Sequence, residues 1–148
     1  MESQNVDLST LPPEALESIV KQTEQEISIL RSSIVQLRSA QSRFRQSKDS
    51  LDQLNTTEPD SEMLVPLTDS LYVPGRSRDT SKVLVEIGTG YYAERKVDQA
   101  KGYFSRKVKY LDGRIKELSE AHDQKNQLLN VSSQLLRQHQ QAASQKSQ

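Results

Sequence analysis

The chain has 148 residues with equal numbers of acidic and basic side chains, so it offers no net field that would attract nucleic acid or an anionic membrane. Hydrophobic residues make up 33% and aromatic residues 5%, too little for an ordinary compact core, which indicates an elongated protein. The absence of cysteine excludes disulfides and thiolate metal sites. We find no apolar run of the roughly 20 residues that a membrane span needs and no secretory leader, and we expect a cytoplasmic protein, with the nucleus left open.

The first long element expected is a helix over residues 13–56. Residues 1–10 are polar and are expected to be flexible, and the Pro12-Pro13 pair then suits the first turn of a helix. Apolar residues recur at alternating steps of four and three, which is the seam of a coiled coil. The seam is Leu16, Val20, Thr23, Ile27, Leu30, Ile34, Leu37, Gln41, Phe44, Lys48 and Leu51.

Residues 62–95 hold nearly all of the β-type sequence and predict two hairpins. In the first, the apolar runs 63–67 and 70–74 are separated by the polar pair Thr68-Asp69. In the second, the runs 82–87 and 91–95 flank Gly88-Thr89-Gly90, where both glycines are expected to supply the positive φ angles of a tight turn.

Both faces of these short strands carry apolar side chains. Val83, Val85 and Ile87 alternate along one face of the third strand, and Leu84 lies on the other. Four short strands of this kind cannot cover themselves, so the cover must come from elsewhere. Pro66 and Pro74 lack an amide proton and therefore limit which strand edges can pair with another chain.

A second coiled-coil helix is expected over residues 96–138, and the Gln- and Ser-rich tail 139–148 is expected to be disordered. Because the strands lead the chain back, the two helices should pack as an antiparallel coiled coil, with Leu54 near Val97 at its base. Polar residues should weaken the other end of the seam. The second seam is Phe104, Val108, Leu111, Ile115, Leu118, His122, Lys125, Leu129, Ser132 and Leu136.

No constellation of residues indicates catalysis, a cofactor or a metal. Residues 88–93 fit the G-x-G-x-x-A dinucleotide fingerprint, but no second parallel strand follows and a hairpin turn explains both glycines. His122 and His139 lack partners at metal-ligand spacing. The basic clusters 43–45 and 106–109 could contact nucleic acid, although the zero net charge favours a solvated surface. We therefore expect that the protein is not an enzyme and that nucleic acid is a disfavoured partner.

The hairpin motifs carry a family resemblance. Leu64-Val65-Pro66-Leu67-Thr68, Leu71-Tyr72-Val73-Pro74-Gly75 and Val85-Glu86-Ile87-Gly88-Thr89-Gly90-Tyr91-Tyr92, between two coiled-coil helices, resemble an α-class subunit of the prefoldin family. The resemblance implies a heterohexamer with one further α-class and four β-class subunits, joined through a double β-barrel. It also implies that the arm tips hold unfolded polypeptides such as actin and tubulin and deliver them, without ATP, to the cytosolic group II chaperonin.

The resemblance assigns two sets of residues to this function. The subunit-assembly residues would be Val65, Leu67, Leu71, Val73, Val83, Val85, Ile87 and Tyr91. The client-binding tip would contain Leu8, Leu11, Leu16, Ile19, Leu128, Leu129, Leu135 and Leu136. An alternative function is a structural coiled-coil adaptor that tethers folded partners or a nucleic-acid complex through its outer polar faces and needs no exposed apolar tip.

Overall fold

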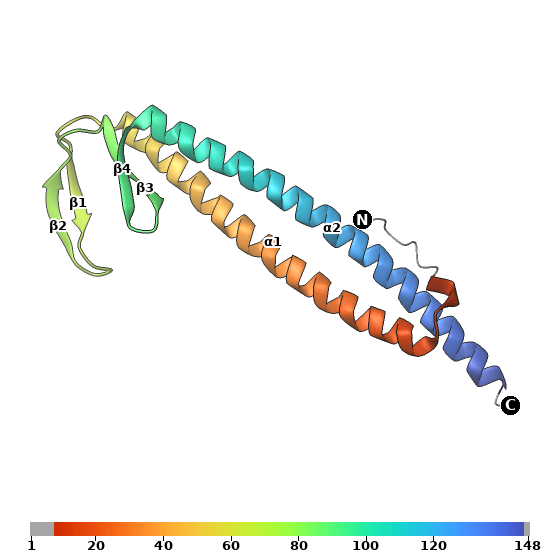
Figure 1. The fold of residues 1–148 in the computed structure, drawn as a ribbon. Coiled ribbons are helices and arrows are strands. Elements are labelled where there is room, and N and C mark those ends of the chain that lie inside the picture. Colours follow the sequence, from red (N-terminus) through yellow and green to blue (C-terminus); the bar gives the residue numbers. More distant parts are fainter. Residues whose placement is uncertain (1–7, 147–148) are drawn as a thin grey trace. The chain divides into compact units, whose positions relative to one another are not determined.

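The computed structural model describes residues 8–146 and has the predicted order of helix, two hairpins and helix (Figure 1). A 3₁₀ turn at the start lies within the segment expected to be flexible, and the rest of that segment, residues 1–7, lies outside the described residues. The elements are η1 (Leu8–Thr10), α1 (Pro13–Thr56), β1 (Glu62–Pro66), β2 (Tyr72–Arg76), β3 (Lys82–Gly88), β4 (Tyr91–Lys96) and α2 (Val97–Lys146).

The predicted end of the second helix is wrong. Helix α2 continues past Gln138 to Lys146 instead of giving way to a disordered tail. The added residues are mainly Gln, Ala, Ser and Lys, with no Gly or Pro, and most of these types have good helix propensity. The loss of the apolar period removes packing but does not stop a helix that has already been nucleated.

The chain divides into two compact units, which we describe separately. The hairpin unit is Ser39–Asp112, and the terminal unit consists of Met1–Arg38 and Gly113–Gln148. Within both units every predicted seam residue of α1 and α2 is buried or half-buried, which confirms the seam.

In the hairpin unit, β3 packs onto the helices to form a small core. Its buried members are Leu51 from α1, Val85 from β3, and Val97 and Ala100 from α2. Leu54 packs against this cluster, as the predicted register required. The Phe44 and Phe104 rings, with centroids 6.1 Å apart, extend the apolar contact along the helices.

One buried polar residue joins the two helices of the hairpin unit. Gln41 donates from Nε2 to Asp112 Oδ1 at 2.5 Å and to the carbonyl oxygen of Val108 at 3.3 Å. Arg45 lies 3.8 Å from the same Asp112 oxygen. A buried amide with partners on the facing helix fixes one register, because any slip would leave it unpaired.

The terminal unit contains a less well satisfied seam. Thr23 is buried but bonds to its own helix, at 2.7 Å from the Ile19 carbonyl oxygen. Lys125 pairs with Glu26 across the helices at 2.6 Å. Ser132 has no exposed surface, and its hydroxyl has no hydrogen-bond partner within the described part of the chain.

The second hairpin turns with one left-handed residue, not two. Gly90 has φ +77°, whereas Gly88 ends β3 without a positive φ, so the expectation for Gly88 is wrong. A ladder irregularity between Glu86 and Gly88 explains this, since the extra residue, Ile87, accommodates part of the turn. Glu86 also accepts a hydrogen bond from the Gly90 amide at 3.1 Å.

Candidate functional site

The first hairpin exposes apolar side chains on both of its faces. Strands β1 and β2 pair antiparallel, with Val65 opposite Val73 and Leu64 opposite Pro74, and neither strand contains a buried residue. Leu64 is 66% exposed. Since burial of apolar surface is the main driving force of association, this hairpin presents a ready interface.

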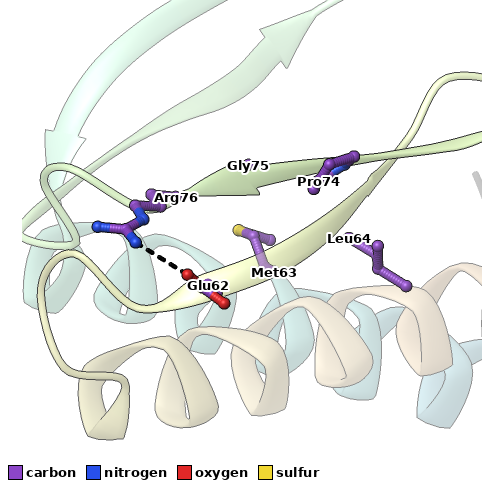
Figure 2. A pocket seen from close by; sticks show the side chains of 6 residues that line it. All are labelled: Glu62, Met63, Leu64, Pro74, Gly75 and Arg76. Atoms are coloured by element: carbon purple, nitrogen blue, oxygen red, sulfur yellow. Dashed lines mark hydrogen bonds and ion pairs between the residues drawn. The ribbon is translucent and has the colours of Figure 1, made fainter.

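A shallow hollow of about 500 Å³ lies over this hairpin. Figure 2 shows Met63 and Leu64 of β1, Pro74 and Gly75 of β2, and the pair Arg76 and Glu62, whose side chains meet at 2.8 Å. A Cβ on Gly75 would come within 3.0 Å of Val65 Cγ2, so the glycine lets the Val65 side chain lie across the partner strand. The lining is mainly apolar and suits another protein surface better than a polar ligand.

The hydrogen-bond ladder shows which edge of this hairpin can pair further. The pairs Ser61/Ser77 and Leu67/Leu71 are hydrogen-bonded, at 3.1 Å and 2.9 Å. Because antiparallel pairs alternate, Leu64/Pro74 is a non-hydrogen-bonded pair whose backbone groups point outward. Pro74 therefore removes a donor from the middle of the outer edge of β2. On the outer edge of β1, Pro66 removes a donor only at the end of the strand, and Leu64 keeps its donor. The edge of β1 is the one better able to accept another strand.

The second hairpin has one face on the helices and one face open. Val83 and Val85 of β3 pack against the helical core. On the opposite face Leu84 is 70% exposed, and Tyr92 on β4 is exposed as well. Tyr91, at the turn, is 74% exposed. The open face therefore carries large apolar groups with no cover from the described part of this chain.

The structure brings most of the predicted assembly residues to the surface of the two hairpins. Leu67, Leu71, Val73, Ile87 and Tyr91 are exposed, Val65 and Val83 are half-buried, and Val85 is buried. Val85 belongs to the chain's own core and holds the second hairpin on the helices. Sequence reasoning omitted Met63, which shares the face of Val65, and four exposed residues on the opposite strand faces that the two-sided apolar pattern indicated. These four are Leu64, Tyr72, Leu84 and Tyr92.

The predicted client-binding residues are more covered than an open tip would be. Leu16 has no exposed surface, so the helices would have to separate locally before it could touch a client. The remaining seven are half-buried: Leu8, Leu11, Ile19, Leu128, Leu129, Leu135 and Leu136. Ile29, Val35 and Val131 are exposed apolar residues of the terminal unit that the prediction did not include. The client-binding assignment remains a prediction.

Titratable groups in the described residues form no metal site. No group of three or more His, Asp or Glu side chains in residues 8–146 is placed to hold an ion. His122 instead contacts Asn126, with 3.1 Å between Nδ1 and Nδ2. Lys125, and then Gln22, donate hydrogen bonds that lower the pKa of Glu26 below its usual value. Nor does any helix in the described range combine the length and apolar character that crossing a bilayer requires.

These features define a class of protein: a two-helix coiled-coil subunit whose intervening hairpins expose apolar surface. The profile of the family described as "Prefoldin subunit" matches residues 23–142. Prefoldin subunit 5 of Homo sapiens is 36% identical over 140 residues, covering 92% of this chain and 91% of that protein. The probable prefoldin subunit 5 of Schizosaccharomyces pombe is 43% identical over 123 residues, covering 82% and 80%.

A solved structure agrees with these matches. The cryo-EM structure of filamentous PFD from Methanocaldococcus jannaschii superposes with a TM-score of 0.68 at 25% identity, covering 76% of this chain and 93% of that one. The chain belongs to the prefoldin family and is a subunit of the prefoldin co-chaperone complex, as the hairpin motifs predicted.

Proposed function

We propose that this chain is one of two α-class subunits in a heterohexamer with four β-class subunits. The exposed apolar surface on both hairpins carries the proposal, because a stable chain would not leave Leu64, Leu84 and Tyr91 open to water unless partners cover them. The open edge of β1 supports joining by strand addition. The complex works without catalysis, in the cytoplasm.

The finer proposal is that the terminal unit holds unfolded polypeptides such as actin and tubulin for delivery to the group II chaperonin. Supporting it are the half-buried leucines of this unit and a seam weakened by Thr23 and Ser132. Each apolar contact is weak, at about 25 cal/mol per Å² buried, and ordering the client opposes it. Several arms acting together would raise the effective concentration, so the grip would be firm overall and yet released arm by arm.

Assembly and client binding are tested separately. The chain is expressed with one α-class and two or more β-class partners, the mass of the product is measured, and suppression of aggregation of denatured actin is followed by light scattering. Deletion of residues 1–20 together with 128–148 of this chain is expected to abolish suppression of aggregation. The complex should still assemble, with a mass equal to the sum of the shortened chain and its partner subunits. Undiminished suppression by the shortened complex would refute the client-binding assignment, and a well-folded monomer that ignores its partners would refute the assembly.

A further inference from the structure

A second hollow in the hairpin unit lies away from the first hairpin. It is a groove of about 480 Å³ between β3, β4 and the first turns of α2, with Val85 and Ile87 on one side and Gly102 and Tyr103 on the other. A smaller hollow of about 280 Å³ shares Tyr103 and continues along α2 to Tyr110. We call the two together the basic groove.

Cations dominate the charge of the basic groove. Arg95, Arg106 and Lys107 line it, against the single carboxylate of Asp98. Among residues 8–146, no carboxylate lies within ion-pair distance of any of these three cations. Lys101, on the same helix, is by contrast paired with Asp52. The cations of the basic groove are therefore available to an anion from outside.

An aromatic face accompanies the charge. Lys107 Nζ lies 5.5 Å from the centroid of the half-buried Tyr103 ring, and Tyr110, two turns beyond Tyr103 along α2, is 64% exposed. Exposed tyrosines next to cations are typical of binding surfaces, because each ring offers a large contact area at little cost in conformational entropy.

Gly102 keeps the basic groove open. It lies inside a long helix, where glycine lowers helix propensity, and it has no positive φ that would require it. A Cβ at this position would lie 3.5 Å from Arg106 Nη1, so the arginine side chain folds over the glycine. A large side chain at position 102 would fill the groove and displace the guanidinium.

We infer that the basic groove binds an acidic peptide segment of another protein, with one apolar side chain against Ile87 and Tyr103 and carboxylates against the cations. This goes beyond the proposed function, because the cations and tyrosines of the groove belong to neither the assembly set nor the client-binding set, although Ile87 on its apolar side is also an assembly residue. A nucleic acid fits less well, since a phosphate backbone would leave the apolar side of the groove uncovered, whereas a peptide can place an apolar side chain there.

The experiment uses the assembled complex and a fluorescein-labelled peptide with one leucine flanked on each side by two glutamates. Anisotropy is expected to show salt-sensitive binding that Arg106→Gln with Lys107→Gln weakens at least about tenfold. Gly102→Leu is expected to weaken binding to a similar degree with every charge retained, while Gly102→Ala leaves binding nearly unchanged. Lys116→Gln, an exposed cation elsewhere on α2, is the matched control and should have no effect.

Changes to the peptide make the test independent of protein folding. Replacing its glutamates with glutamine, or its leucine with serine, is expected to reduce binding to the wild-type complex. Equal binding of these peptides, tighter binding of a single-stranded oligonucleotide of the same charge, or binding by the isolated chain that is lost on assembly would each overturn the inference. Aggregation of actin is measured in parallel, because the basic-groove variants should leave its suppression intact even if the peptide fails to bind.

Discussion

Two leucines of the hairpin unit separate the contacts that hold the second hairpin on the helices from the contacts that it offers to partner subunits. Leu51 is 8% exposed in the core beneath β3, and Leu84 is 70% exposed on the open face of the same hairpin. Changing each to alanine removes the same atoms from opposite environments. We predict that Leu51→Ala destabilises the chain itself and that Leu84→Ala weakens only assembly.

The magnitudes follow from burial. Removing three carbons from a buried site costs about 0.8 kcal/mol each in transfer free energy, about 2.4 kcal/mol together. The cavity adds to this, but a small core between two helices and one hairpin can partly collapse, so we expect about 3 kcal/mol for Leu51→Ala. At Leu84 less than a third of the side chain is covered, which limits the effect on the isolated chain to less than about 1 kcal/mol.

The assay is urea unfolding of the isolated chain, followed by circular dichroism, together with size-exclusion chromatography of the chain mixed with its partner subunits. Leu51→Ala should shift the unfolding midpoint strongly. Leu84→Ala should leave it nearly unchanged and reduce the yield of assembled complex. Equal stability losses for the two variants, or full assembly of Leu84→Ala, would refute the assignment of the open face to partners.

Three further changes test local features by unfolding of the isolated chain. Ser132→Ala should raise the free energy of unfolding by about 1 kcal/mol, because it removes a buried hydroxyl without a partner in the described chain. A lower free energy of unfolding would show that the hydroxyl does have a hydrogen-bond partner. Gly90→Ala, at φ +77°, should cost about 1 kcal/mol, whereas the control Gly113→Ala, in a helix with open space around it, should be neutral or stabilising. Because Lys125 lowers the folded-state pKa of Glu26, that carboxylate stabilises the fold above its unfolded pKa and the contribution is lost as pH falls through the folded value. Glu26→Gln should therefore flatten acid unfolding, and an unchanged pH profile would count against the pair.

The sequence could predict the parts of the fold that depend on repeating patterns. Steps of three and four placed Leu51, Leu54 and Val97 correctly because one apolar stripe on each helix has only one way to be buried. Turn residues predicted that both hairpins exist, but the predicted two-residue link Thr68-Asp69 is wrong. Leu67 pairs with Leu71, so the first turn has three residues, 68–70, and β2 begins at Tyr72.

Features that depend on single backbone or packing events were not predictable in this way. The irregular ladder at Ile87 changed which glycine turns the chain, and alternation of side chains carries no information on such a bulge. Helix α2 passes Gln138 because propensity outweighs the loss of pattern there. Leu16 is fully buried and Gly102 lines a groove because of how the elements pack in three dimensions. The periodicity of the sequence carries no information on that packing.

The polar residues of the seam differ in what they do for helix pairing. Gln41 is buried and bonds to two groups on the facing helix, so separating the helices of the hairpin unit would exchange both bonds for bonds to water, at a net cost of about 1 kcal/mol each. Thr23, in the terminal unit, bonds only to its own helix and loses nothing when the helices part. Ser132 would gain water for its hydroxyl.

The ion pair of Lys125 with Glu26 joins the helices of the terminal unit, but it is partly exposed and therefore screened by salt. Opening of the helices thus costs less per residue in the terminal unit than in the hairpin unit. Since Leu16 is fully buried, the proposed binding of a client there requires such opening. The proposal of client binding in the terminal unit therefore rests on a seam whose polar residues make fewer bonds between the helices than Gln41 makes in the hairpin unit.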